Sequence, residues 1–184
     1  YEYKDRSFIF AQLGYTWFHS NNGGTANDPF WNAGLTHTFG PYSVSIATGV
    51  QYPVDPLSGV TRETDYSLTL NRLLNRGTIG ASFSYATFSG TNIDIDSRYA
   101  AGITASYELT QKLTGTFAGS LERYDHQLVN SYTRRIFVST GVSYPLPKGI
   151  SLALTYSFID YYSPVIFADN YQVNRVVLEA RKTF

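Results

Sequence analysis

The stretch Thr78-Ile79-Gly80-Ala81-Ser82-Phe83-Ser84-Tyr85-Ala86-Thr87-Phe88 alternates between two kinds of side chain. Residues of a β-strand point in turn to two opposite faces. Ile79, Phe83 and Tyr85 therefore share one face, and Gly80 and the serines share the other. A helix would need apolar residues three and four positions apart, and this stretch does not have them. It predicts a strand with one apolar face and one face of small residues.

The same alternation recurs along the chain and predicts ten strands, at 7–18, 30–39, 42–52, 62–72, 78–88, 98–109, 113–124, 132–144, 150–161 and 171–184. Each is about as long as a tilted strand that crosses a bilayer, roughly 9–11 residues or more. All seven prolines are expected in connections or at strand ends, because proline cannot donate to a ladder. The connections alternate between tight turns and longer loops, as in transmembrane barrels.

Composition narrows the class of protein. The 184 residues carry 14 Lys and Arg against 14 Asp and Glu, and this balance excludes a strongly basic nucleic-acid binder. Without cysteine there is no disulfide or cysteine–zinc site. Charged residues make up 15% and aromatic residues 16%, which suits a surface that meets lipid. No apolar run approaches the roughly 20 residues of a spanning helix. The chain begins at Tyr1 without an initiator Met, so we expect a mature or trimmed chain.

In lipid every backbone N–H and C=O must be paired, so strands can span only as a closed sheet. We therefore predict an all-β fold, a closed antiparallel transmembrane β-barrel of ten strands that forms a single domain over 1–184. Strand 171–184 is expected to pair with strand 7–18.

Aromatic residues are expected to gather at the two membrane–water interfaces of such a barrel. One predicted girdle lies near the longer loops and the other near the short turns. The first comprises Trp17, Trp31, Tyr52, Tyr66, Tyr85, Tyr99 and Tyr132, and the second Phe39, Tyr42, Tyr107, Tyr144 and Phe184.

Inward positions are mostly small, which leaves room for water inside the predicted barrel. The charged inward candidates are Glu63, Asp65, Glu108, Glu122, Arg135, Arg175, Glu179 and Arg181. Both signs occur, so we expect these residues to pair across the lumen. They either line a narrow polar channel or form a plug that only stabilises the barrel, and both interpretations remain open.

The chain resembles the outer-membrane β-barrel proteins of Gram-negative bacteria. The most specific feature is the last strand, in which Val176, Leu178, Ala180 and the terminal Phe184 look like the signal read by the family's insertion machinery. Gly102–Tyr107 and Gly141–Tyr144 are loosely similar to porin-like barrels associated with exopolysaccharide export. The resemblance implies an outer-membrane location, short periplasmic turns and longer extracellular loops. It implies lipid, lipopolysaccharide and the insertion machinery as partners, with other envelope proteins or copies of the chain as further candidates.

Acids and histidines near the longer loops are candidates for a catalytic or metal site. Asp125 and His126, with Asp94 and Asp96, resemble the acids and histidine of outer-membrane proteases. Adjacent residues of an extended segment face opposite ways, however, so only one of Asp125 and His126 can face the lumen. No metal-ligand spacing or phosphate-binding loop is present. We expect no enzyme activity, catalytic residue, cofactor or metal.

The predicted function is a narrow passive, porin-like channel or a barrel subunit of an envelope complex. A structural anchor or scaffold with an occluded lumen is the alternative, followed by an outer-membrane hydrolase at the extracellular mouth. Arg123 and Arg134 are expected to face outward near the longer loops, where they could pair with lipopolysaccharide phosphates or serve as ordinary rim charges.

Overall fold

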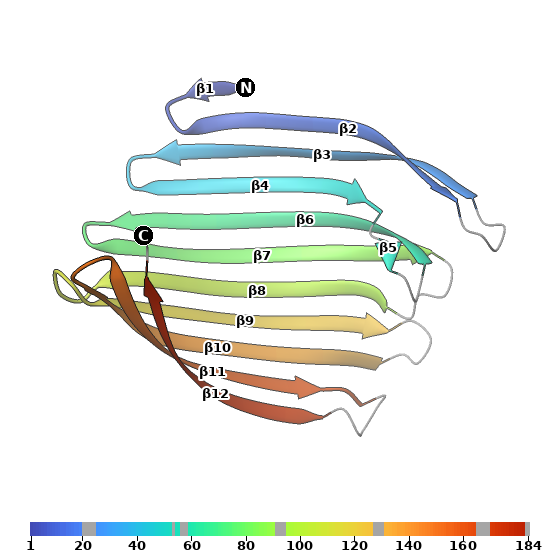
Figure 1. Cartoon of the computed structure of the whole chain (residues 1–184). Coiled ribbons are helices and arrows are strands. Elements are labelled where there is room, and N and C mark those ends of the chain that lie inside the picture. The colour runs from blue at the N-terminus through green and yellow to red at the C-terminus, as the bar shows by residue number, and fades with distance from the viewer. Residues whose placement is uncertain are drawn as a thin grey trace.

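A computed structural model describes residues 1–19, 25–52, 54–55, 59–90, 95–126, 131–164 and 170–182, and every element in these ranges is a β-strand (Figure 1). The strands are β1 (Glu2–Lys4), β2 (Ser7–His19), β3 (Thr25–Phe39), β4 (Tyr42–Gln51), β5 (Val54–Asp55), β6 (Gly59–Leu74), β7 (Gly77–Gly90), β8 (Ile95–Glu108), β9 (Thr114–His126), β10 (Ser131–Leu146), β11 (Ile150–Tyr162) and β12 (Tyr171–Lys182). None of the described residues forms a helix long and apolar enough to cross a membrane.

Eleven of these strands pair side by side in one antiparallel sheet, in the order β1-β2-β3-β4-β6-β7-β8-β9-β10-β11-β12, and β5 pairs only with β6. The ten long strands match the ten predicted ones in order and position. The predicted count of ten is nevertheless wrong for the sheet, because the short strand β1 adds an eleventh. Sequence alternation does not find β1, which is only three residues long.

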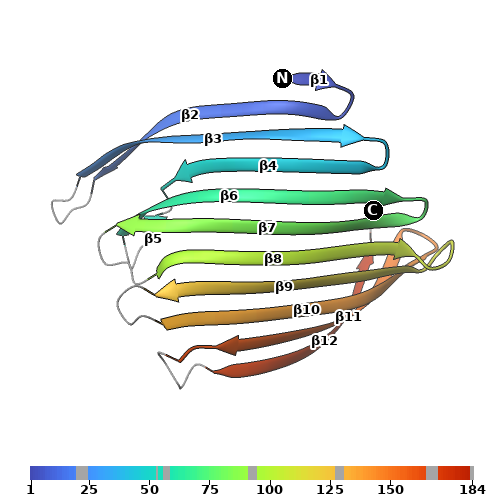
Figure 2. The same ribbon diagram turned by 180° about the vertical axis from the view of Figure 1, so that it is seen from behind.

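The predicted closure is also not found. Within the described residues β12 pairs only with β11, and the start of β2 pairs with β1 instead. The amino group of Tyr1 donates to the carbonyl oxygen of Ile9 at 2.7 Å, and the Ile9 N–H donates to the Tyr1 carbonyl oxygen at 2.8 Å. These two bonds place β1 along the edge that β12 was expected to occupy. The sheet is therefore open, with β1–β2 at one edge and β12 at the other (Figures 1 and 2).

The open sheet is strongly curved. The end of β12 passes in front of the middle strands in Figure 1 and behind them in Figure 2, which is seen from the opposite side. Figure 1 thus looks into the concave face, and Figure 2 looks onto the convex face.

Tight turns join the strands at one end of the sheet. Gly40, between β3 and β4, has a φ of +56°, which glycine adopts at no steric cost. Between β8 and β9 the hydroxyl oxygen of Thr110 accepts the N–H groups of Lys112 (3.3 Å) and Leu113 (3.0 Å). Such local bonds hold short connections without a large loop.

One proline lies inside a strand, contrary to the prediction. Pro29 is within β3, whereas Pro145 is the second-last residue of β10 and lies at a strand end, as predicted. Both occupy stretches with one neighbour only: Pro29 pairs with Tyr15 of β2, and Pro145 pairs with Ser151 of β11. Among the described residues each stretch therefore has one side without a ladder, where proline is tolerated.

The concave wall is not lined by small residues alone. On β2 and β3, Gly14 lies opposite Phe30, and Gly34 lies opposite Phe10. A Cβ atom added to Gly14 would collide with the Phe30 ring, and one added to Gly34 would come within 2.5 Å of the Phe10 ring. Each phenyl ring therefore lies over a glycine of the neighbouring strand, an arrangement known to stabilise glycine in sheets.

Candidate functional site

The sheet has an apolar convex face with the character of a lipid-facing surface. Among the described residues only Val50 and Ala86 are buried hydrophobic side chains. Leu13 is 86% exposed and Leu178 is 75% exposed, and register places both on the convex face. A water-soluble protein rarely exposes an apolar surface of this extent.

The predicted girdle residues lie on this same face. Paired residues of neighbouring strands share a face, and the register from β2 to β12 puts Trp17, Trp31, Tyr66, Tyr85, Tyr99 and Tyr132 there near the longer connections, and Phe39, Tyr42, Tyr107 and Tyr144 near the tight turns. Tyr52 lies just after β4, outside the paired ladder. Phe184 is outside the described residues, while Val176, Leu178 and Ala180 of the predicted insertion signal are on the convex face.

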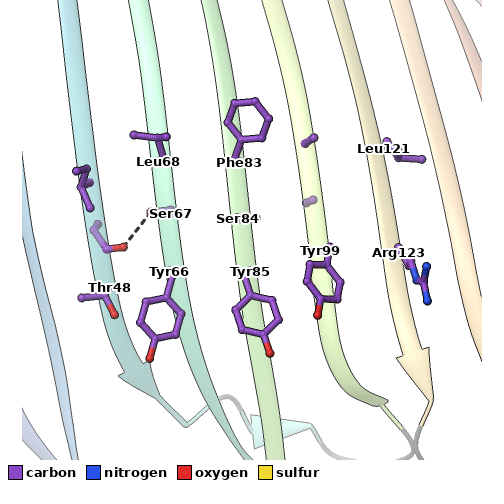
Figure 3. A pocket seen from close by; sticks show the side chains of 14 residues that line it. Thr48, Tyr66, Ser67, Leu68, Phe83, Ser84, Tyr85, Tyr99, Leu121 and Arg123 are labelled. Atoms are coloured by element: carbon purple, nitrogen blue, oxygen red, sulfur yellow. Dashed lines mark hydrogen bonds between the residues drawn. The ribbon is translucent and has the colours of Figure 1, made fainter.

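Three tyrosines form a row at the edge of a shallow hollow on the convex face (Figure 3). The Tyr66 and Tyr85 ring centroids are 6.3 Å apart, and those of Tyr85 and Tyr99 are 4.8 Å apart. The hollow has a volume of about 660 Å³, and Leu68, Phe83 and Leu121 line it farther along the strands from the tyrosine row. Its lining is almost entirely apolar and offers few polar groups for chemistry.

Arg123 and Arg134 lie directly opposite each other on the convex face, as predicted for outward residues. Each has a carboxylate partner: Arg123 Nε is 2.7 Å from Asp125, and Arg134 Nη2 is 3.3 Å from Asp160. The Arg123 guanidinium also lies 4.5 Å from the centroid of the Tyr132 ring, a cation–π contact. The carboxylates offset the charges of both arginines, which weakens the attraction of Arg123 and Arg134 for an anion.

The concave face carries a belt of charged residues near the longer connections, which is the candidate functional site. At one end of the belt Glu63 of β6 is 8% exposed and accepts two hydrogen bonds. Arg98 Nη2 donates to its Oε1 at 3.0 Å, and Gln51 Nε2 donates to its Oε2 at 3.1 Å. Asp65 follows on the same face of β6, one row deeper.

The other end of the belt is built by β9 and β10. Glu122 and Arg135 are direct partners in the ladder, with 3.6 Å between Glu122 Oε2 and Arg135 Nη1. The Tyr124 hydroxyl donates to the same carboxylate oxygen at 2.9 Å. Tyr124 pairs with Arg98 across β8 and β9, so the two ends form one band: Glu63 and Asp65, then Arg98, then Glu122 and Arg135.

Arg98 is absent from the lining residues predicted from the sequence. The signal for it was present, because an outward Tyr99 requires its neighbour to face inward. The expected pairing across the lumen is also not found: the described ion pairs of the belt join residues on the same or a nearby stretch of wall. Such pairs brace the sheet laterally.

The remaining predicted lining residues share the concave face but lie outside the belt. Glu108 is exposed at the tight-turn end of β8. Arg175, Glu179 and Arg181 are exposed on the edge strand β12 and, among the described residues, make no ion pair. The interior charges are therefore brought together only at one end of the sheet.

The candidate catalytic pair Asp125 and His126 does not come together. Asp125 is on the convex face, paired with Arg123, whereas His126 is on the concave face, with its Nε2 at 2.7 Å from the Thr133 hydroxyl. Asp94 is outside the described residues. In the part of the chain that the structure describes, no three acids or histidines gather as a metal site would require.

Three solved structures share this fold. OmpTdeltaL8, a loop L8 deletion mutant of OmpT, an outer membrane protein of Vibrio cholerae, superposes with a TM-score of 0.67 at 13% identity, over 96% of this chain and 61% of that one. In-vitro folded OmpT superposes with a TM-score of 0.63 at 12% identity, over 96% of this chain and 59% of that one. An anion-selective porin from Comamonas acidovorans superposes with a TM-score of 0.60 at 18% identity, over 84% of this chain and 46% of that one. No protein-family model matches the chain, and no curated protein matches it in sequence.

The fold is that of bacterial outer-membrane β-barrel proteins, and the predicted outer-membrane location agrees with it. The chain spans less than two thirds of the length of each of these proteins. The more specific similarity to barrels of exopolysaccharide export finds no support among them.

Proposed function

We propose that the chain forms the wall of a narrow passive channel in the outer membrane. The observation that supports this most is the contrast between its two faces. The convex face exposes large apolar side chains, whereas the concave face holds the hydrogen-bonded belt from Glu63 to Arg135. Charges of this kind are stable beside water and costly beside hydrocarbon.

In this proposal lipid and lipopolysaccharide surround the convex face, and the insertion machinery reads the last strand. The tight turns face the periplasm and the longer connections face the exterior. The shared fold with longer barrel proteins supports a sheet that is part of a larger closed wall.

The channel is expected to select poorly between anions and cations. Register places seven acids of the described strands on the concave face (Glu2, Asp28, Glu63, Asp65, Glu108, Glu122 and Glu179), against four arginines (Arg98, Arg135, Arg175 and Arg181). The lining mixes both signs, and Glu63 and Glu122 are offset by arginines, so the small excess of acids favours cations only weakly.

Planar-bilayer recordings of the folded protein test the proposal. We expect small, discrete single-channel steps with a reversal potential near zero in a salt gradient. Protein unfolded in the same detergent is the control and should give no steps. Folded protein that inserts into the bilayer without any steps would contradict the channel.

The alternative is an anchor or scaffold whose lumen is occluded. The lateral ion pairs favour it in one respect, since Glu63 is almost fully buried and braces Arg98 and Gln51. An inserted but silent protein that co-purifies with other envelope proteins would support this second function. The hydrolase at the extracellular mouth has no comparable support, because Asp125 and His126 face apart.

A further inference from the structure

A pocket of about 340 Å³ lies on the concave face near the longer connections, where β8 to β12 come together. Its lining combines aromatic rings with hydrogen-bonding groups. The lining residues are Ile95, Tyr124, His126, Thr133, Arg135, Tyr161 and Tyr171. Register puts all of them on the concave face.

One wall of the pocket is aromatic. Tyr161 of β11 and Tyr171 of β12 are direct ladder partners, and their rings stack nearly parallel with centroids 5.2 Å apart. Tyr171 is 49% exposed, so part of its ring is open to a ligand. A tyrosine ring offers an apolar face and a polar hydroxyl at its rim.

A second part of the lining is polar and already ordered by hydrogen bonds. The His126 ring nitrogen contacts the Thr133 hydroxyl at 2.7 Å, and Thr133 in turn donates to Ser163 at 3.4 Å. Thr133 and Ser163 are buried. This wall therefore keeps its shape without a ligand, which lowers the entropic cost of binding.

Arg135 is the group with the most unused hydrogen-bonding capacity. Its contact with Glu122 is 3.6 Å, longer than a hydrogen bond. Among the described residues its guanidinium donates no hydrogen bond, although it has five N–H donors. Beside it Glu122 offers acceptor lone pairs, so donors and acceptors stand next to each other.

The charges of Arg135 and Glu122 decide the class of ligand. These two charges offset each other, so an anion would be repelled by the carboxylate and a cation by the guanidinium. A neutral ring with several hydroxyl groups can hydrogen-bond to both groups, while its C–H face packs against a tyrosine ring. The volume is at the lower end of ligand pockets and fits about one or two small rings.

We infer that this pocket binds a neutral sugar, with one ring face on Tyr171 and its hydroxyl groups at Arg135 and at the Tyr124–Glu122 pair beside it. The inference rests on the proposed function in one respect: the concave face has to border water. It adds a weak binding station at the mouth of the channel.

Binding is tested on the whole folded protein in a detergent that has no sugar headgroup, such as an amine oxide. Saturation-transfer NMR and titration would compare glucose, glucuronate and glucosamine, which share a ring and differ in charge, together with maltose. We expect glucose and maltose to bind and both charged sugars to bind more weakly. Tighter binding of glucuronate or glucosamine than of glucose would overturn the inference.

Matched variants locate the site. Tyr171→Leu should weaken sugar binding about tenfold, because the ring surface is lost. Tyr171→Phe should keep it, and so should Tyr162→Leu, whose side chain is one residue from Tyr161 but on the convex face. If Tyr171→Leu does not fold, Arg135→Met removes the donors instead and should abolish binding. Unchanged affinity in either folded variant would overturn the assignment.

The two proposals fail in different ways. Single-channel steps without sugar binding would leave the channel in place and remove the sugar site. Sugar binding by a protein that gives no single-channel steps would keep the sugar site and remove the channel.

Discussion

Glu63 is the side chain on which the belt most depends. It is nearly buried, and it accepts hydrogen bonds from Arg98 and Gln51, which belong to different strands. Glu63→Ala removes two partners at once and should lower the free energy of unfolding by about 1–3 kcal/mol. Urea titration in lipid vesicles, followed by fluorescence of Trp17 and Trp31, measures the change.

Glu108→Ala is the matched control for that substitution. Glu108 is also an acid on the concave face, but it is exposed, and no described side chain bonds to it. Its loss should change stability little. Equal effects of the two variants would mean that the belt does not stabilise the sheet.

The face of each charged residue could be predicted from the sequence, whereas its partner could not. Alternation has a period of two, so an apolar neighbour such as Tyr99 fixes where Arg98 points. Pairing depends on register and side-chain reach, which alternation does not encode. Arg135 and Glu122 pair within the wall rather than across the lumen, and Arg175 and Arg181, on the same face, have no ion partner among the described residues.

Among the strands, the reciprocal glycine–phenylalanine pairs of β2 and β3 give a direct test of packing. Gly14→Ala should lower the unfolding free energy by about 1–3 kcal/mol, because the new methyl group collides with the Phe30 ring. The double variant Gly14→Ala, Phe30→Ala should lose less than the sum of the single changes. Folded fraction in vesicles, read from heat-modifiable gel migration, reports the effect.

Gly119→Ala serves as the comparison for those variants. A Cβ at Gly119 would have no neighbour closer than 3.6 Å, which is ordinary van der Waals contact. We expect this variant to fold like the parent. Additive losses in the double variant would instead show that the ring of Phe30 does not pack over Gly14.

The long strands were predictable because each has enough alternating residues for the pattern to be read. The short strands were not. β1 has three residues and β5 has two, and β1 is held by backbone bonds between Tyr1 and Ile9 rather than by a side-chain pattern. The misplaced proline has a similar cause: whether Pro29 is tolerated in β3 depends on which neighbouring strand is missing beside it.

For the whole molecule, the two edges of the sheet set the main physical demand. In hydrocarbon an unpaired strand edge leaves N–H and C=O groups without partners at a cost of several kcal/mol each. We therefore expect the outer edges of β2 and β12 to be paired in the membrane. Amide hydrogen exchange of the inserted protein should find β12 as well protected as β7 to β9. Fast exchange confined to β12 would mean that its edge borders water.

Closure was the part of the fold that the sequence could not supply. Each strand and turn is encoded locally, but which strand completes the wall depends on the total number of strands. A closed ring of ten strands requires a free edge on strand 7–18, and β1 lies along the start of that edge.

The lateral direction of the ion pairs has a consequence for engineering the pore. Glu63 pairs with Arg98 and Glu122 pairs with Arg135 along the wall, and no described ion pair crosses the space in front of the concave face. Neutralising them would change how the lining meets ions, yet it would not enlarge the bore. The calibre is set by strand number and tilt alone, so a wider passage would have to be made by adding hairpins.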